Sequence, residues 1–155
     1  MAGEISDIRA RAIEGIQTGD TFTAVRTFTF DETLAFGKLT QDANPVHYDD
    51  AFAREKAFSA PVLHGLLTGG MLCEIGGQIG WLATAMEFSF LRPVYDGDTI
   101  TCRFTVTDVG SKGIKARASV EYENQHGVTV LLADLTGHLP TAEQRRLMAE
   151  TKHPF

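Results

Sequence analysis

Alternating apolar and polar residues predict the strands of this chain. Residues 21–30 carry apolar side chains on one face and threonines on the other, which is the period of a half-buried strand. The apolar positions are Phe22, Ala24, Phe28 and Phe30. Arg26 interrupts this face, so we expect the face to be imperfectly buried or Arg26 to lie near a sheet edge. Four later segments alternate in the same way: 86–90, 99–106, 114–122 and 128–139. The loops at 110–113 and 124–127 are typical of hairpins and predict antiparallel pairing of consecutive strands.

Helical patterns flank and separate these strands. Residues 4–17 place isoleucines on a rough helical stripe, which predicts a helix within an N-terminal extension of residues 1–19. Asp31 is expected to cap a short helix that follows the first strand. Residues 141–152 predict an exposed, charged helix within a C-terminal tail of residues 141–155.

One buried helix is predicted over residues 65–80, which are apolar on nearly all sides and show no alternation. The segment contains the glycines Gly69, Gly70, Gly76 and Gly77. Each interior glycine costs roughly 1 kcal/mol relative to alanine. Close packing of the helix against a sheet offsets this cost, because a glycine lets two segments of backbone approach one another.

The order of these elements predicts an α+β fold. One strand, a helical and loop region and one buried helix precede four antiparallel strands, and a length of 155 residues fits a single domain over 1–155. A mostly apolar central helix beside a curved antiparallel sheet is the hot-dog arrangement, in which the sheet wraps around the helix.

Composition and charge narrow the functional classes. The net charge is −6 and the longest basic cluster is Arg145-Arg146, so the chain has no footprint for nucleic acid. No window approaches 18 consecutive apolar residues, and the N-terminus lacks an apolar signal region, so we expect no membrane segment and a cytoplasmic location. Cys73 and Cys102 stand alone, which predicts reduced, buried thiols and no metal site.

The stretch from residue 39 to residue 47 is the densest in reactive side chains. Asp42 and His47 lie five residues apart around the rigid Asn44-Pro45 turn, so the loop can point both side chains at one place. A carboxylate and an imidazole that share a site can hold a water molecule, take a proton from it and deliver a proton elsewhere. The alternative is a plain turn, in which Asp42 and Asn44 bond their own backbone and His47 lies on the surface.

A second candidate stretch, residues 60–66, lies at the entrance to the predicted buried helix. The N–H of Gly65 near the first turn of that helix can stabilise a developing oxyanion. The alternative is that Gly65 only permits a tight turn and that His64 is a structural histidine with its hydrogen bonds satisfied. On the helix itself, Cys73 has no adjacent base to activate it, and Glu74 is expected to face solvent.

Read together, the two stretches resemble the hydratase motif of the MaoC-like dehydratase family and, more narrowly, the R-specific enoyl-CoA hydratases. The matching residues are Thr40-Gln41-Asp42-x-Asn44-Pro45-x-His47-x-Asp49, Ala51-Phe52-Ala53 and Phe58-x-x-Pro61-x-x-His64-Gly65. The later Phe88-Ser89-Phe90-Leu91-x-Pro93-Val94-x-x-Gly97-Asp98 is similar to the strand and turn after the central helix of that family. Two positions depart from the pattern: Gln41 stands where the family usually has glycine, and Cys73 where it often has serine.

The resemblance implies a reaction and a set of site residues. It implies that Asp42 and His47 are the catalytic pair, that the Gly65 N–H binds the thioester oxygen, and that Asn44 shapes the loop. Water then adds reversibly to a trans-2-enoyl thioester, carried on coenzyme A or an acyl-carrier protein, to give an (R)-3-hydroxyacyl thioester without a metal or other cofactor. The alternatives are a hot-dog acyl-CoA thioesterase and a non-catalytic subunit that binds acyl thioesters.

A homodimer is also expected, because one sheet wrapped around one helix leaves an edge strand open to pairing. Joined edges make one continuous sheet and bring the substrate arm near the junction. Lys112, Lys115 and Arg117 are candidate contacts for the phosphates of that arm, with a solvated strand face as the alternative.

Overall fold

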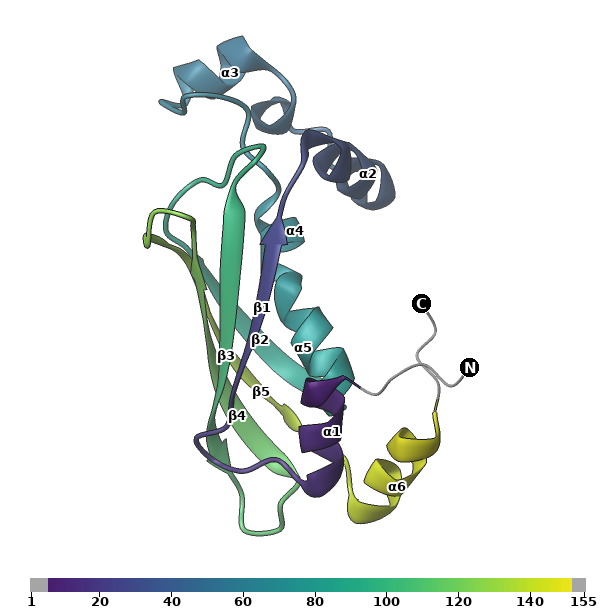
Figure 1. The fold of residues 1–155 in the computed structure, drawn as a ribbon. Helices are drawn as coiled ribbons and strands as arrows, with labels where there is room; N and C mark the ends of the chain where they lie inside the picture. The colour runs from purple at the N-terminus through teal and green to yellow at the C-terminus, as the bar shows by residue number, and fades with distance from the viewer. Residues whose placement is uncertain (1–5, 152–155) are drawn as a thin grey trace.

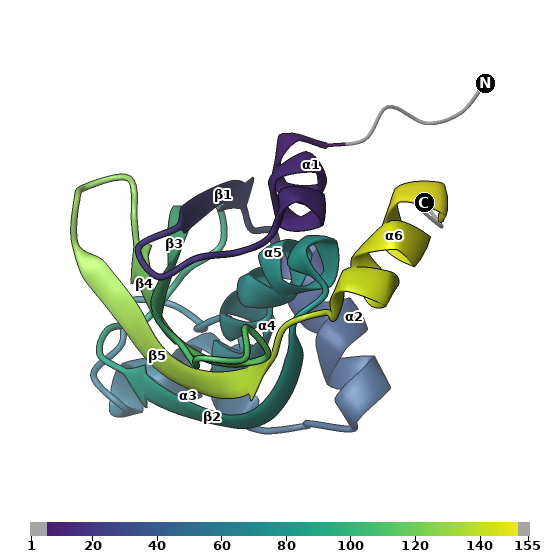
Figure 2. The same cartoon turned by 90° about the horizontal axis from the view of Figure 1, so that it is seen from below.

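The computed structural model describes residues 6–151 as one curved antiparallel sheet wrapped around a helix (Figures 1 and 2). The helices are α1 (Asp7–Glu14), α2 (Phe30–Thr40), the 3-10 turn η1 (Pro45–His47), α3 (Asp50–Glu55), α4 (Gly65–Gly69), α5 (Met71–Ile79) and α6 (Ala142–Glu150). The strands are β1 (Thr21–Thr27), β2 (Leu82–Phe90), β3 (Thr99–Val109), β4 (Lys115–Glu123) and β5 (Thr129–His138). The predicted α+β hot-dog arrangement is confirmed. None of the described helices is both long and apolar enough to cross a membrane.

The strands lie in the order β1-β3-β4-β5-β2, and every neighbouring pair is antiparallel. Hairpin pairing is confirmed for β3 with β4 and for β4 with β5. It is wrong for β2 and β3, because β2 pairs with β5 at one edge while β3 lies beside β1 near the other. Residues 91–98 make this crossing and are fixed by backbone hydrogen bonds from Leu91 N–H to Val130 and from Leu63 N–H to Val94. The segment therefore crosses the end of the sheet, and its path brings it to the cavity described below.

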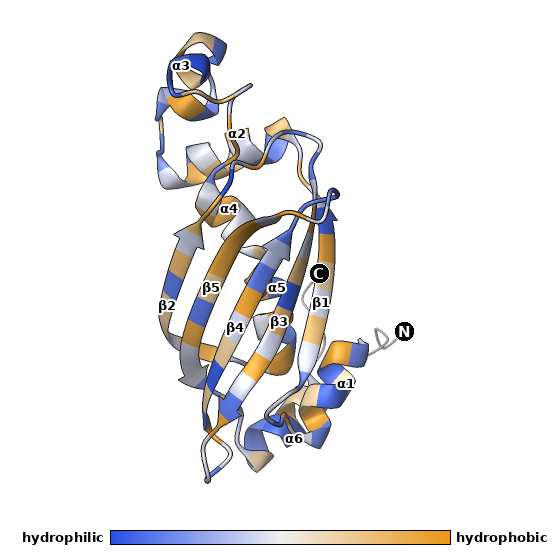
Figure 3. Cartoon of the chain, turned by 90° about the vertical axis from the view of Figure 1, so that its left-hand side faces the viewer, coloured by the Kyte–Doolittle hydropathy of each residue, from blue (hydrophilic) through white to orange (hydrophobic). Residues whose placement is uncertain are grey.

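The concave face of the sheet and the helix form the core. Ile75 and Ile79 of α5 are fully buried against alternate residues of the strands, which supply Ile100, Cys102, Phe104, Val106, Ala118, Val120, Tyr122, Leu131, Ala133 and Leu135. Hydropathy alternates along the strands, as expected for a sheet with one covered face (Figure 3). The two cysteines differ from the prediction in part, since both are free and Cys102 is buried, but Cys73 is exposed.

The central helix is less uniform than its sequence indicates. Gly70 separates α4 from α5, and the buried Tyr122 hydroxyl donates a hydrogen bond of 2.7 Å to the Gly69 carbonyl beside this break. α5 buries one face against the sheet, while Cys73 and Glu74 are exposed on the other. The expectation for Glu74 is confirmed, but the helix is not buried along its whole circumference, because the sheet covers only one side of it.

Close packing against the sheet explains Gly65 and Gly69 but not Gly76 and Gly77. A β-carbon at Gly65 would lie 2.5 Å from the Phe90 ring, and one at Gly69 would lie 3.0 Å from the Phe88 ring. These glycines let the aromatic residues of β2 contact the helix backbone directly. At Gly76 the nearest atom would be 3.8 Å away and at Gly77 none lies within 4 Å, so packing against the sheet does not account for them.

The segment after the first strand differs from its prediction. β1 ends at Thr27, and α2 begins at Phe30, so Phe30 belongs to the helix rather than to the strand face. Thr29, not Asp31, caps α2, because Thr29 and Glu32 exchange side-chain and backbone hydrogen bonds in a capping box. β1 is an edge strand, which confirms the expectation drawn from Arg26.

The first and last helices lie against each other at the end of the sheet away from α2 and α3 (Figure 1). α1 is shorter than the predicted helix over 4–17, and residues 4 and 5 lie outside the described part of the chain. It ends at Gly15, whose φ of 115° suits glycine. α6 ends at Glu150, and the remainder of the predicted C-terminal tail beyond residue 151 is likewise not described.

Candidate active site

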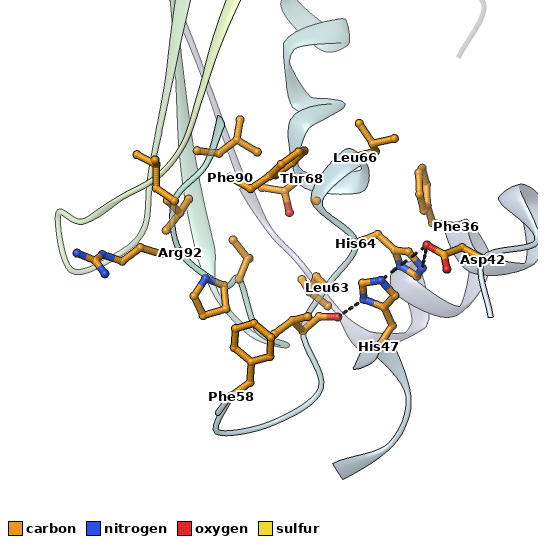
Figure 4. A pocket seen from close by; sticks show the side chains of 17 residues that line it. Phe36, Asp42, His47, Phe58, Leu63, His64, Leu66, Thr68, Phe90 and Arg92 are labelled. Carbon is orange, nitrogen blue, oxygen red and sulfur yellow. Dashed lines mark hydrogen bonds and ion pairs between the residues drawn. The ribbon is translucent and has the colours of Figure 1, made fainter. Parts of the chain in front are cut away.

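A cavity of about 450 Å³ opens at the end of the sheet where α2, η1 and α4 meet (Figure 4). Most of its wall is apolar and comes from Phe36, Phe58, Val62, Leu63, Leu66, Phe90, Leu91, Pro93, Val94, Val130 and Leu131. Its polar residues are few, and three of them, Asp42, His47 and His64, gather at one side. A mostly apolar cavity with a few convergent polar groups is typical of a small-molecule site.

The loop after α2 positions Asp42 and His47. Gln41 ends α2 in the left-handed conformation with φ of 60°, and this turns the chain so that the Asp42 N–H bonds the Gly37 carbonyl. The Asn44 side chain then caps η1 by accepting the Val46 N–H at 3.2 Å. His47 is the last residue of η1, so two short local motifs separated by two residues bring both predicted side chains to the cavity.

Asp42 and His47 face each other as the spacing predicts. Asp42 Oδ2 lies 3.7 Å from His47 Nε2, and the side chains are 42% and 12% exposed respectively. His47 Nδ1 lies 2.7 Å from the Val62 carbonyl oxygen, so Nδ1 carries a proton and donates it. In the neutral imidazole, Nε2 therefore presents its lone pair toward Asp42. A separation of 3.7 Å exceeds a direct hydrogen bond, and both atoms are acceptors to which a water molecule at the cavity wall can donate.

His64 is a third member of the group, which the sequence analysis treated as a structural histidine. Its side chain is 3% exposed, and its Nε2 lies 3.5 Å from Asp42 Oδ2. Its ring stacks on His47 with centroids 3.8 Å apart and 25° between the ring planes. Nδ1 is buried and has no hydrogen-bond partner among the described residues, so the expectation of a fully satisfied histidine is wrong. Burial, followed by the nearby His47, lowers the pKa of His64 below its ordinary value.

Tyr48 connects His64 to Asp42 through its hydroxyl group. The hydroxyl donates a hydrogen bond of 2.5 Å to the Asp42 backbone carbonyl and lies 3.2 Å from His64 Nε2. Burial and the Asp42 carboxylate raise the pKa of Tyr48, so its proton stays in place. A β-carbon at Gly37 would clash with the Tyr48 hydroxyl, so a glycine in α2 makes room for this contact. The pattern around residue 48 contained no signal for this role.

Gly65 lies at the cavity wall as the first residue of α4. The first N–H groups of a helix have no acceptor within it, so the Gly65 N–H is available to a ligand at the wall. Its φ is not positive, which argues against the alternative that Gly65 serves only a tight turn. The Phe90 ring supplies the steric reason for glycine at this position.

The remaining candidates divide between the cavity and the surface. Asn44 is exposed and its side chain is engaged in capping η1, so the structure does not bring it to the cavity wall. Cys73 does not line the cavity either. Lys115 pairs in register with His138, whereas Leu131 at the cavity lies seven residues earlier on β5. At about 3.3 Å per residue this places Lys115 roughly 23 Å from the cavity within one chain. Arg92, which the sequence analysis did not select, does line it.

One oxygen of Asp42 and one nitrogen from each histidine lie within 4.8 Å of one another, which meets a first requirement for a metal site. A metal ion, however, binds an imidazole nitrogen near the plane of its ring. Two rings stacked at 25° direct their nitrogens side by side instead of toward a common tetrahedral centre. The arrangement suits proton transfer better than metal coordination, and the absence of a metal stays a prediction.

Comparisons with known proteins find similar sequences and a similar fold. Residues 15–130 match the sequence profile of the family described as "MaoC like domain". The chain is 28% identical over 131 residues to the (R)-specific enoyl-CoA hydratase of Aeromonas caviae, covering 82% of this chain and 98% of that protein. It is also 28% identical over 131 residues to a mitochondrial 3-hydroxyacyl-[acyl-carrier-protein] dehydratase of Solanum lycopersicum, covering 81% and 79% respectively. The solved (R)-hydratase from A. caviae superposes with a TM-score of 0.74 at 29% identity, over 81% of this chain and 98% of that one.

Proposed function

The chain belongs to the MaoC-like domain family, and from that premise we propose that it adds water reversibly to trans-2-enoyl thioesters to give (R)-3-hydroxyacyl thioesters. The observation that carries the proposal is the placement of Asp42 and His47 at 3.7 Å on the wall of an apolar cavity. The names of the two relatives, a hydratase and a dehydratase, support the two directions of one reaction.

Asp42 and His47 bind and activate the water. The water oxygen forms a bond to C3 of the substrate while one of its protons passes to the pair, and C2 receives a proton from the same site. The sum is the addition of one water molecule across the double bond, and the reverse sequence is dehydration. Asp42 Oδ1 accepts the Asn44 N–H at 3.1 Å, which leaves Oδ2 as the oxygen directed at the histidines.

Gly65 stabilises the charge that develops on the thioester oxygen. Addition at C3 gives an enolate-like state, and the N–H at the start of α4 donates a hydrogen bond to its oxygen. A backbone donor is fixed in place before the substrate arrives, so it needs no reorganisation during the reaction. The acyl chain occupies the apolar remainder of the cavity, between Phe58, Phe90 and Leu131.

The carrier arm passes Arg92, which lies across the cavity from the histidines (Figure 4). Its guanidinium is suited to a phosphate of coenzyme A or of a carrier-protein arm. Arg92 thus replaces Lys112, Lys115 and Arg117 as the phosphate contact within one chain, because the hairpin after β3 and the first half of β4 lie at the opposite end of the sheet.

A panel of trans-2-enoyl-CoAs, from crotonyl-CoA to decenoyl-CoA with a branched member, tests the proposal. We expect loss of the enoyl absorbance and a 3-hydroxyacyl-CoA of R configuration, with no release of free coenzyme A. Free thiol without a hydroxyacyl product would indicate the thioesterase instead. Tight binding of the panel without turnover would indicate a non-catalytic subunit. A product of S configuration would contradict the proposed stereochemistry.

A homodimer is proposed on the evidence of the β2 edge. β2 has one neighbour, and Leu82 and Met86 on this strand are exposed apolar residues. Pairing of two such edges satisfies the strand backbone and covers these side chains. Light scattering at micromolar concentration is expected to give twice the mass of 16.9 kDa, and a monomer mass would contradict the dimer. Two free cysteines are consistent with the proposed cytoplasmic location.

A further inference from the structure

The buried His64 has polar contacts that the proposed acid–base pair does not use. Its Nε2 lies near the Asp42 carboxylate, and Phe36 packs on its ring with centroids 5.1 Å apart (Figure 4). The same nitrogen lies 3.2 Å from the Tyr48 hydroxyl oxygen. A histidine that served only to fill the core would not need two oxygen atoms near one nitrogen. These contacts indicate which ring nitrogen of the neutral His64 carries the proton.

The hydrogen bonds of Tyr48 settle the protonation of His64. The one hydroxyl proton of Tyr48 is donated to the Asp42 carbonyl at 2.5 Å. At 3.2 Å from His64 Nε2, the hydroxyl oxygen can therefore only accept, and Nε2 must carry the hydrogen. A neutral imidazole then has its lone pair on Nδ1, which is the nitrogen without a partner among the described residues.

His47 has the opposite tautomer, because its Nδ1 donates to the Val62 carbonyl. The stacked histidines thus present different groups to the same carboxylate: His47 presents a lone pair and His64 presents an N–H. If both were protonated, two cations would lie 3.8 Å apart. Burial lowers the pKa of His64 and so favours its neutral form.

We propose that His64, oriented by Tyr48, is a positioning residue whose Nε2–H is shared between the Tyr48 hydroxyl oxygen at 3.2 Å and Asp42 Oδ2 at 3.5 Å, and that this contact keeps the carboxylate aimed at the water site. The proposal rests on the proposed hydration. The titratable groups that face the Asp42 carboxylate are His47 and Tyr48 from the segment after α2 and His64 from the segment before α4, and Arg92 lies on the far wall of the cavity. Among these groups, only His64 offers a neutral nitrogen donor.

Two substitutions of His64 separate its hydrogen bond from its volume. His64→Gln keeps an N–H donor near the position of Nε2, whereas His64→Leu fills a similar volume without a donor. The first readout is the ¹³C NMR chemical shift of the Asp42 carboxyl carbon at neutral pH. We expect this chemical shift to change in His64→Leu, because the carboxylate loses a hydrogen-bond donor, and to stay near the wild-type value in His64→Gln. ¹⁵N NMR of the wild type is expected to show a proton on Nε2 of His64.

The second readout is turnover of crotonyl-CoA. His64→Leu is expected to lower kcat roughly 10- to 100-fold with little change in KM, since a misdirected carboxylate no longer holds the water. His64→Gln is expected to restore most of this loss. Phe36→Leu is the matched control, because it disturbs packing on the same ring without touching a polar contact, and we expect no change in the Asp42 carboxyl chemical shift.

Three results would overturn the proposal: an Asp42 carboxyl chemical shift that is the same in His64→Leu as in the wild type, a loss of kcat in His64→Gln equal to that in His64→Leu, or a proton on Nδ1 of His64. The NMR readouts need no substrate. If the wild type fails to hydrate any enoyl-CoA, the proposed function fails, while the ¹⁵N NMR spectrum still decides the placement of the His64 proton.

Discussion

Replacement of Gly65 by alanine tests the packing at the start of α4 most directly. A β-carbon there would lie 2.5 Å and 2.7 Å from two atoms of the Phe90 ring, closer than two carbon atoms can approach. Either the ring or the helix must therefore move. Phe90 is 55% exposed, so its ring can move outward, and we expect Gly65→Ala to destabilise the protein by about 1–3 kcal/mol, as overpacked sites do.

Phe90→Ala, which removes the ring, is the second substitution of a double-mutant cycle with Gly65→Ala. Truncation of a fully buried phenylalanine costs about 3–5 kcal/mol, so the half-exposed Phe90 should cost about 2 kcal/mol in Phe90→Ala. Once the ring is absent, the added methyl group has room. The free energy of unfolding of the double variant should therefore lie within about 0.5 kcal/mol of that of Phe90→Ala. The coupling between the two positions is then roughly equal to the cost of Gly65→Ala alone.

Urea unfolding of the wild type, the two single variants and the double variant measures this cycle. Gly77→Ala is the control, because a β-carbon at this exposed helix position meets no atom within 4 Å. We expect this substitution to raise the free energy of unfolding by up to about 1 kcal/mol, since alanine favours the helix over glycine. Alanine retains the backbone N–H, so kcat of the double variant should match that of Phe90→Ala. Additive losses in stability would refute the steric explanation, and a much lower kcat in the double variant would refute the role given to the N–H.

The remaining predictions concern the polar groups of the cavity. Asp42→Asn keeps an oxygen for the Asn44 N–H but loses the charge, so we expect kcat to fall roughly 10²- to 10⁴-fold and the free energy of unfolding to change by less than about 0.5 kcal/mol. We expect His47→Gln to lower kcat by a similar factor. The double variant should lose far less activity than the product of the two single losses, because both residues act on one water molecule. Full activity in Asp42→Asn would contradict the site. Because burial lowers the pKa of His64 in the folded state, the unfolded chain binds a proton first as pH falls below about 7, and stability should fall by up to about 1.4 kcal/mol per pH unit. Urea unfolding from pH 7 to pH 5 should show a shallower fall in His64→Gln, and equal slopes would speak against a buried neutral histidine. Arg92→Gln should raise KM for an enoyl-CoA at low salt but not for the N-acetylcysteamine thioester, and an equal effect on both would exclude a phosphate contact.

Local patterns were enough to predict the strands and the paired side chains. Alternation is a local consequence of the strand period, so all five strands could be located, and a loop of six residues with a rigid turn kept Asp42 and His47 together. The neighbour of β2 could not be predicted in this way. Its pairing with β5 depends on the path of residues 91–98 across the end of the sheet, which no periodicity encodes.

The sequence alone could not predict which individual polar side chains are buried. His64 has no neighbour in sequence that reveals its stacking on His47, because that contact joins two segments held together by hydrogen bonds such as that from Val62 N–H to Val46. Gln41 shows the converse case. The positive φ at this position gives a physical reason for the glycine of the family motif, and the substitution of glutamine leaves the turn in place.

The contact between α1 and α6 has a practical meaning for how the protein can be rebuilt. These helices pack together at one end of the sheet, while the cavity lies at the other (Figure 1). A short linker between them, with a new opening in the hairpin at 110–113, would reorder the chain without cutting any segment that contributes to the cavity. The end of the sheet opposite the cavity is therefore the place where the chain can be permuted, fused to another protein or attached to a surface while the cavity stays intact.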